Sequence, residues 1–269
     1  MFRFENLHKT RSLAFITTLT MPKRYADIRF ISAFCVSFYT KSLRGEVMGE
    51  QKNTKMCISL LHYTPLHICS HAIRTCWQSF EKGDNGGEKD KELINRVGNK
   101  FKHTSTLEHL YYNFYIQGIS RACLQELARH RMASFSVKSS RYTLKELKNL
   151  PSFLPINAEN LARAEEFVVF TQNEQVNHAS LRALESLREI LCNNISSDIA
   201  KFAMPESYRT ELSFSINARS LQNLLSLRTS KSALWEIRNL ALALFNALPA
   251  EQRFIFEHCI STENAEKDA

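Results

Sequence analysis

Residues 129–142 read R-H-R-M-A-S-F-S-V-K-S-S-R-Y, and this stretch is the most informative in the 269-residue chain. It holds three arginines, one lysine, one histidine and four serines, and no acidic residue. Arginine presents planar pairs of donors, and serine hydroxyls complete the hydrogen bonds of a bound anion. The stretch also follows a predicted helix, whose carboxyl end favours cations. From charge alone, a solvated helix end and loop is the simpler interpretation, and an anion site is the alternative.

The sequence on either side of this stretch is mostly helical in pattern. Apolar residues at helical spacing predict helices over 64–80, 93–101, 120–128, 158–192, 218–228, 231–248 and 251–259, and a short helix ending at 204–205. Thr64 is the expected N-cap of the first helix, and a break is expected near Asn173. Alternating residues predict one strand over 110–116, ended by Gly118, and a second over 208–216. Helices with a few strands indicate an α+β fold.

Glycine is scarce, and this limits how the protein can bind phosphate. The chain has seven glycines and contains neither G-x-G-x-x-G nor G-x-x-x-x-G-K-[ST]. Both glycine-rich phosphate loops are therefore excluded, and any phosphate must be held by side chains or helix ends.

The positive charge is concentrated at the amino terminus. Residues 1–55 carry ten of the 35 basic residues and four of the 27 acidic ones, so most of the net charge of +8 lies there. The rest is nearly neutral, and a basic pI is therefore weak evidence for nucleic-acid binding. Basic residues before the apolar run 13–19 faintly resemble a targeting peptide. A disordered extension or an overextended reading frame, with Met48 or Met56 as the true start, is the favoured interpretation.

The cysteines and histidines indicate neither disulfides nor a metal. Seven cysteines are an odd number, and no C-x-x-C occurs, so a disulfide framework or structural zinc is not expected and a reducing compartment, the cytoplasm, fits best. Their apolar surroundings favour a structural role for them. His103 and His109 lie six residues apart without a third ligand at a sensible spacing, so we expect no metal. No apolar stretch approaches the length of a membrane span.

Helical periodicity gives Arg228 an unusual position. Asn217, Leu221, Leu224 and Arg228 fall on one face of the 218–228 helix, so the arginine continues an apolar stripe. A cation facing the core needs an anionic or carbonyl partner. An arginine that extends from the helix end into water is an equal alternative.

Spacing within 129–142 changes the interpretation of that stretch. R-H-R-x-x-S-x-S-x-x-S-x-R resembles the signature of the flavin-dependent thymidylate synthases, R-H-R-x-x-S-x-N-x-x-S-x-R, in every defining position except Ser136. W-Q-S-F at 77–80, H-T-S-T-L-E-H at 103–109 and N-A-R-S-L-Q-N at 217–223, ending at Arg228, resemble three further family segments. The resemblance covers about 56–259, and it divides the chain into residues 1–55, a family-like domain over 56–260 and a polar tail over 261–269.

The resemblance implies a fold and an activity. The fold would be a single α+β domain with a small, mainly antiparallel sheet packed by several helices. The activity would be methylation of dUMP to dTMP, with methylenetetrahydrofolate as carbon donor and FAD, reduced by NADPH, as hydride carrier. A homotetramer with active sites at subunit interfaces, and no nucleic-acid or membrane partner, are also implied.

The resemblance assigns roles to individual residues. The expected FAD ligands are Ser79, His103, Ser105, Arg129, His130, Arg131, Asn217, Arg219 and Asn223, with residues 129–131 supplying cations for the phosphates. The expected dUMP ligands are Glu126, Arg129, Ser139, Ser140, Arg141, Lys201 and Arg228. Arg228 is the expected catalytic residue, since a fixed positive charge favours uracil ionised at N3. From spacing alone, Arg219 and Asn223 could instead form a local helix-surface contact.

Two departures from the family and two other functions stay open. Glu126 stands where the family commonly has Gln. Lys201 stands where the family often has Arg, and a lysine keeps the positive charge but lacks the planar fork of donors. The alternative function is a non-catalytic RNA- or polyanion-binding protein, in which the 129–141 stretch contacts phosphates while Phe135 and Tyr142 stack on bases. A family member that has lost its activity is the third possibility.

Overall fold

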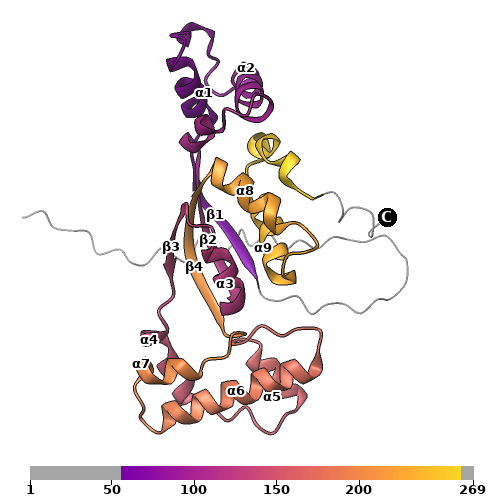
Figure 1. Ribbon diagram of the computed structural model, residues 1–269. Helices are drawn as coiled ribbons and strands as arrows, with labels where there is room; N and C mark the ends of the chain where they lie inside the picture. The colour runs from indigo at the N-terminus through magenta and orange to yellow at the C-terminus, as the bar shows by residue number, and fades with distance from the viewer. Residues whose placement is uncertain (1–55, 262–269) are drawn as a thin grey trace, which may run out of the picture. The chain divides into compact units, whose positions relative to one another are not determined.

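Residues 56–261 are described by the computed structural model, and a four-stranded sheet lies at the centre of their fold (Figure 1). Its strands are β1 (Cys57–Tyr63), β2 (Tyr111–Ser120), β3 (Ala133–Val137) and β4 (Arg209–Asn217). They lie in the order β1-β2-β4-β3, and every neighbouring pair is antiparallel. The expected α+β fold with a small antiparallel sheet is confirmed. The predictions for residues 1–55 and for 262–269 lie outside the described residues.

Two of the four strands were predicted, and two were missed. The predicted strands over 110–116 and 208–216 are β2 and β4, which pair along most of their length. The prediction that Gly118 ends its strand is wrong. Gly118 has a φ of +76°, and the β2–β4 register shifts between Gln117 and Ile119, so the glycine makes a bulge while the strand continues to Ser120.

Most helices follow the predicted periodic segments. The helices are α1 (Leu66–Thr75), α2 (Glu88–Ile94), α3 (Arg121–Ala128), α4 (Ser140–Thr143), α5 (Ala158–Ala164), α6 (Glu174–Cys192), α7 (Ser197–Ala200), α8 (Ala218–Arg228) and α9 (Trp235–Asn246). The short α4 was not predicted, and α2 begins before its predicted segment. The expected break near Asn173 is confirmed, because its side chain caps α6 by accepting the Val176 N–H. No helix within 56–261 combines the length and the apolar character that a membrane crossing needs.

Several helix predictions need correction at their ends. The N-cap of α1 is Pro65 rather than Thr64, whose hydroxyl instead accepts the backbone N–H of Tyr111 on the neighbouring strand. The predicted helix over 251–259 is two short 3-10 turns, Ala250–Ile255 and Glu257–Cys259. A π-helical turn, Asn95–Lys100, extends α2. Short-range hydrogen bonds set these ends, and apolar spacing does not report them.

One face of the sheet carries the main core. Tyr112, Phe114 and Ile116 of β2 alternate with polar residues, and their side chains are fully buried. Leu127 of α3, Leu224 of α8 and Leu240 of α9 belong to the same apolar cluster, and these three helices lie against this face (Figure 1). The sheet thereby fixes where α3 and α8 end, and both ends carry predicted site residues.

A second apolar cluster lies among the helices between β3 and β4. Leu144, Phe153, Val168, Leu184 and Leu187 are fully buried in it. Helices α5 and α6 supply most of its wall, and α6 buries leucines on one face. This cluster supports the segments that follow β3 and precede β4, which include Ser139–Arg141 and Lys201.

Candidate functional site

Helix α8 carries Arg228 at its end because both its cap and its apolar face are well defined. The side chain of Asn217 accepts the Ser220 N–H at 2.8 Å and begins the helix. Leu221 and Leu224 on the following turns are fully buried. Arg228 continues their stripe, and its side chain is only 15% exposed. The inward direction predicted from helical spacing is therefore present in the structure.

The end of helix α3 supplies the partners of this guanidinium. Nη1 of Arg228 donates to Oε2 of Glu126 at 2.7 Å, and Nη2 donates to the backbone carbonyl of Glu126 at 3.1 Å. Nε donates to Nε2 of His130 at 3.0 Å. A charge-assisted pair of this kind satisfies the desolvated cation. The anionic partner that sequence reasoning required is thus Glu126, from within the chain.

His130 is uncharged in this environment. Burial is the main reason that its pKa falls to about 4; the positive charges of Arg228 and Arg129 act in the same direction, and Glu126 opposes them with a smaller effect. An imidazole nitrogen that accepts a hydrogen bond from Arg228 must also be unprotonated. A neutral ring favours a hydrogen-bonding role for His130 over a cationic one. Its contact with the flavin stays a prediction.

Arg129 and Arg131 lie beside this group and are exposed. The side chain of Arg129 lies with Nη1 3.9 Å from Oε2 of Glu126. Arg131 lies two residues before the start of β3, whose pairing with β4 was not predicted. Along β3, Phe135 packs on Phe214 with ring centroids 5.2 Å apart. Phe135 is partly buried against the main core, so it is less available for the base stacking that the RNA-binding alternative needs.

A second group of predicted residues lies where α8 begins. Nη1 of Arg219 donates to Oε1 of Glu108 at 2.6 Å, and both side chains are about half exposed. Glu108 belongs to the 3-10 turn Thr104–His109, which also holds Ser105 and directly follows His103. Asn223 is exposed on the same helix as Arg219. Ser79 precedes the 3-10 turn Phe80–Lys82 that follows α1. Arg219 therefore forms an ion pair with Glu108, and within the residues that the structure describes it has no hydrogen bond to its helical neighbour Asn223.

A third group follows β3. Arg141 binds Asp198 through two hydrogen bonds, Nε to Oδ1 at 2.5 Å and Nη2 to Oδ2 at 3.2 Å. Asp198 lies in α7, and Lys201 begins the 3-10 turn after that helix. Ser139 precedes α4, and Ser140 begins it. This group therefore brings the expected phosphate-binding serines, Arg141 and Lys201 to neighbouring elements of the second cluster.

Sequence reasoning missed the acidic partners of these cations. Glu108 lies inside the quoted 103–109 segment, so its position was known while its role was not. Asp198 is 57 residues from Arg141, and nothing in the sequence linked the two. Tertiary contacts of this range have no periodic signal.

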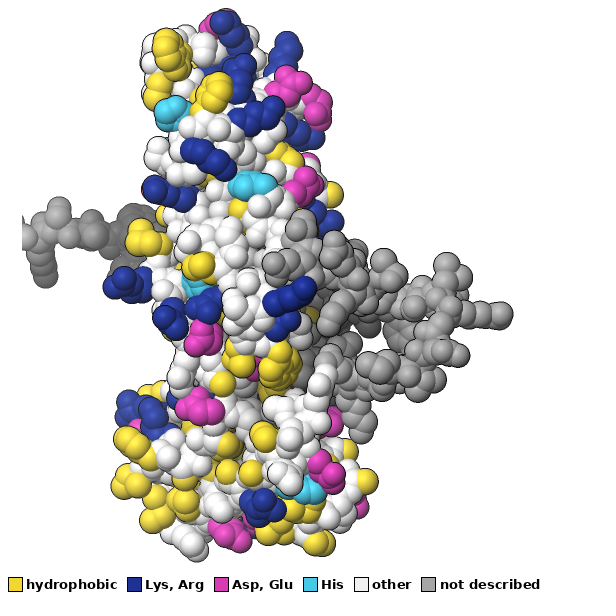
Figure 2. Space-filling view, turned by 45° about the vertical axis from the view of Figure 1, so that its right-hand side comes forward, with side chains coloured by type: hydrophobic (Ala, Val, Ile, Leu, Met, Phe, Trp, Pro, Cys, Tyr) yellow, Lys and Arg dark blue, Asp and Glu magenta, His cyan; other side chains and the backbone are white. Residues whose placement is uncertain are grey.

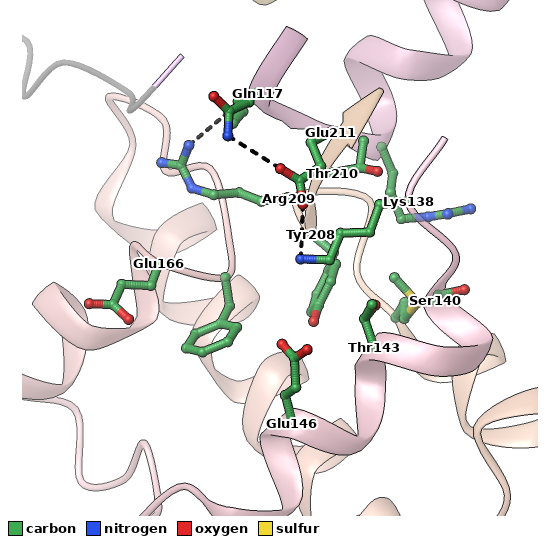
Figure 3. Close-up of a pocket in the computed structure, with 14 residues that line it drawn as sticks. Gln117, Lys138, Ser140, Thr143, Glu146, Glu166, Tyr208, Arg209, Thr210 and Glu211 are labelled. Atoms are coloured by element: carbon green, nitrogen blue, oxygen red, sulfur yellow. Dashed lines mark hydrogen bonds and ion pairs between the residues drawn. The ribbon is translucent and has the colours of Figure 1, made fainter. Parts of the chain in front are cut away.

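A pocket of about 260 Å³ lies elsewhere, where β2 and β4 meet the second cluster (Figure 3). The side chains of Tyr208 and Glu146 point toward one another in it, and burial raises the pKa of Tyr208 to about 12. The guanidinium of Arg209 is held by the backbone carbonyls of Gly118 and Glu165, so its charge serves the fold. Ser140 is the one predicted site residue in its lining. Its volume is below the range of about 300–1,000 Å³ typical of small-molecule sites.

The cysteines fit structural roles. Cys69, Cys123 and Cys259 are buried, and burial raises the pKa of Cys69 to about 12 and also raises that of Cys123. Thiols of this kind stay protonated and are poor nucleophiles. Among residues 56–261, no cluster of three or more His, Cys, Asp or Glu side chains is arranged to hold a metal ion.

Comparison with known proteins agrees with the motif assignments. Residues 59–251 match the family model described as thymidylate synthase complementing protein. A flavin-dependent thymidylate synthase of Campylobacter jejuni is 69% identical over 205 residues, which cover 76% of this chain and 98% of the relative. A flavin-dependent thymidylate synthase of Helicobacter pylori is 66% identical over 200 residues, which cover 74% of this chain and 96% of the relative. A crystal structure of thymidylate synthase X from Helicobacter pylori with FAD and dUMP is similar to this chain, with a TM-score of 0.74 and 65% sequence identity. The match covers 76% of this chain and 99% of the other.

Proposed function

Because this chain belongs to the flavin-dependent thymidylate synthase family, it is an enzyme that methylates dUMP to dTMP with FAD as cofactor, and we propose how its residues divide that work. NADPH reduces the flavin, and methylenetetrahydrofolate donates the carbon. The reaction takes place in the cytoplasm, the reducing compartment that the odd number of cysteines and the lack of a C-x-x-C motif favour. The observation that carries the proposal is the Arg228 group, because it presents a largely buried guanidinium next to exposed cations.

Arg228 is the catalytic residue of this proposal. Its guanidinium lies close to the uracil ring and favours the form ionised at N3, so electron density rises at C5 without an enzyme thiol. The buried cysteines support this division, because their pKa values are raised rather than lowered. Once bound, the flavin supplies the hydride chemistry. The protein's own part is to bind, orient and polarise.

The flavin fits the exposed cations and hydrogen-bond donors of the Arg228 group and of the group where α8 begins. Arg129 and Arg131 hold its phosphates with charge-assisted hydrogen bonds, and Arg219 adds a third guanidinium. The other FAD ligands are those that the family resemblance names: Ser79, His103, Ser105, His130, Asn217 and Asn223. In His130 the neutral ring, rather than a charge, faces the ligand. The exposure of Arg219 supports its role, because exposed ion pairs exchange partners at low cost.

The nucleotide phosphate fits the third group. Its hydrogen-bond donors are Ser139, Ser140 and Arg141, and Lys201 adds positive charge. The rest of the nucleotide, including the uracil ring, is contacted by Glu126, Arg129 and Arg228. The three groups sit on different elements, and the pocket of about 260 Å³ is small for either ligand. We therefore propose a homotetramer in which neighbouring subunits bring these groups together.

The test uses the flavin as its own reporter. The purified protein should show a flavin spectrum, and dUMP with methylenetetrahydrofolate should speed oxidation of its reduced flavin. Arg228→Ala should keep its flavin but lose most dUMP-dependent oxidation, and Arg228→Lys should recover only part, because an ammonium lacks the planar fork. Arg182→Ala, at an exposed position on α6, is the matched control. If Arg228→Ala responds to dUMP as fast as the parent, Arg228 is structural.

A further inference from the structure

The end of helix α3 faces Arg228 with two side chains at helical spacing. Glu126 and His130 are four residues apart, and the backbone N–H of His130 donates to the Leu127 carbonyl, so the helical turn continues past Ala128. This places both side chains on one side of the chain. Arg228 reaches them from α8, whose face is fixed by buried leucines. Both helix ends are therefore anchored to the same core.

The contacts hold the guanidinium in one plane. An arginine side chain has five N–H donors in a fixed fork. Three of them are engaged within the described residues: Nε by His130, Nη1 by the Glu126 carboxylate and Nη2 by the Glu126 carbonyl. Bonds from all three nitrogens leave the group little freedom to rotate. Two N–H donors remain for a ligand.

We propose that His130 and Glu126 are positioning residues that hold the guanidinium of Arg228 in the orientation required to meet the uracil ring. The inference rests on the proposed function and adds a role for His130 that the phosphate-binding assignment does not include. His130 acts as a hydrogen-bond acceptor through Nε2, and Glu126 acts as an acceptor through both its carboxylate and its carbonyl.

The electrostatics of His130 support this role over a cationic one. Its ring is buried beside Arg228 and Arg129, so a second positive charge there is unfavourable. Glu126 is the nearby group that opposes this effect. A neutral ring accepts a hydrogen bond from Arg228, and a protonated one would have to break it. The two roles therefore require opposite protonation states and predict opposite results for the same substitutions.

The experiment compares His130→Gln with His130→Phe in the full-length protein. Gln retains an acceptor near the position of Nε2, and Phe retains the ring volume without an acceptor. Two quantities are measured on each: flavin bound per chain, and the single-turnover rate of dUMP-dependent flavin oxidation. Because His130 is also a proposed FAD ligand, the rates are measured at saturating FAD, and we expect any loss of bound flavin to be similar in the two variants. The rate should stay within about threefold of the parent in His130→Gln and fall about tenfold or more in His130→Phe, as expected for the loss of one orienting hydrogen bond to a charge.

Glu126 provides an independent pair of variants. Glu126→Gln keeps an acceptor and the backbone carbonyl, whereas Glu126→Leu keeps only the carbonyl. The rate should again fall further in the variant without the side-chain acceptor. His178→Phe is the matched control, since His178 lies on α6 within 3.5 Å of Glu174 and outside this group. Its flavin content and rate should equal those of the parent.

Each outcome decides between the roles. Loss of flavin in both His130 variants, with recovery in His130→Lys, would show that His130 binds phosphate as a cation and would overturn the proposal. Equal rates in the Gln and Phe variants would overturn it as well. If His130→Phe does not fold, equal rates in the two Glu126 variants would have the same meaning. A parent protein without dUMP-dependent oxidation would instead refute the proposed function.

Discussion

The predicted cationic residues differ mainly in what each one gives up on binding a ligand. Arg219 and Arg141 are more than half exposed in their pairs with Glu108 and Asp198. Exposed ion pairs contribute about 0–1 kcal/mol, so a ligand phosphate replaces the carboxylate at little cost. The pair of Arg228 with Glu126 is mostly buried, and breaking it would leave a desolvated charge. The exposed arginines are thus suited to exchange partners, and Arg228 is suited to stay in place.

Arg131 provides a direct test of phosphate binding. It is exposed and lies outside β3, two residues before that strand begins, so its removal should leave the core intact. Arg131→Ala should release FAD, with a loss of about 1.5–3 kcal/mol in binding free energy, typical of a hydrogen bond to a charged group. Flavin retained through gel filtration and the thermal unfolding temperature are the two measurements. Unchanged flavin affinity would remove Arg131 from the site.

The sequence carried part of this information at the level of single residues. The spacing of Arg228 to Leu221 and Leu224, a local property, made its burial one of two equal alternatives, and the structure has the buried one. Its partner Glu126 lies 102 residues away, and such pairings arise only when the chain folds. The neutral state of His130 could not be read from its neighbours along the chain, because the burial that lowers its pKa arises only in the folded protein.

At the level of secondary structure, local pattern succeeded where periodicity was strong. The helix over 218–228 has the predicted bounds, and the 158–192 segment has the expected break, although this break extends from 165 to 173 rather than lying only near Asn173. Strand β3 was missed because the sequence around it is rich in serine and charged residues, which is not a strand pattern. Its extended conformation comes from its pairing with β4. Strand β1 lies at the edge of the sheet and pairs with β2 alone. Tertiary pairing overrides weak local preference in both.

Helix α6 depends on one buried carboxylate for its contact with the 151–155 loop. Glu185 accepts from Arg188 Nη2 at 2.7 Å, from the Ser152 hydroxyl at 2.8 Å and from the Phe153 N–H at 2.8 Å. Hydrogen bonds from Arg188 are the main reason that its pKa falls to about 2. Glu185→Gln should therefore lower the free energy of unfolding by about 1–3 kcal/mol at neutral pH, measured by urea denaturation.

The pH dependence of this variant follows from the same shift. A carboxyl group with a folded pKa of about 2 and an ordinary value of 4.5 stabilises the fold fully above about pH 4.5. The contribution is lost as pH falls toward about 2, because protonation then occurs in the folded state too. The stability difference between parent and Glu185→Gln should shrink over that window. A difference that stays constant down to pH 2 would contradict the assignment.

For the whole molecule, the sheet core and the matched motifs both lie after residue 55. Strand β1 begins at Cys57, and the family match covers 59–251. We therefore expect a chain that begins at Met56 to fold with an unchanged melting temperature and to keep dUMP-dependent flavin oxidation. Both measurements are made against the full-length protein. A lower melting temperature or lost turnover would show that residues 1–55 contribute to the enzyme.

The proposed tetramer has a physical counterpart on the surface of the second cluster. In Figure 2, hydrophobic side chains gather over the lower part of the molecule, where Figure 1 places α4 and α7. Tyr142, Ile199 and Phe202 are 68%, 65% and 89% exposed there. Large apolar side chains exposed in this number are typical of a surface that another protein chain covers. They lie on the same elements as Ser140 and Asp198, so an interface here would reach the nucleotide-binding group.

Replacing these apolar side chains should therefore affect assembly and ligand binding together. We expect the double variant Ile199→Ser with Phe202→Ser to fold, because both side chains lie outside the core, and to dissociate toward smaller species in sedimentation velocity. Its flavin content should fall in parallel, because the groups that hold the two ligands would no longer meet across subunits. Val176→Ser, which removes an apolar side chain 47% exposed on α6, is the control and should change neither. A variant that stays tetrameric with full flavin would show that the interface uses another surface, whereas one that dissociates but keeps its flavin would show that a single chain holds the flavin alone.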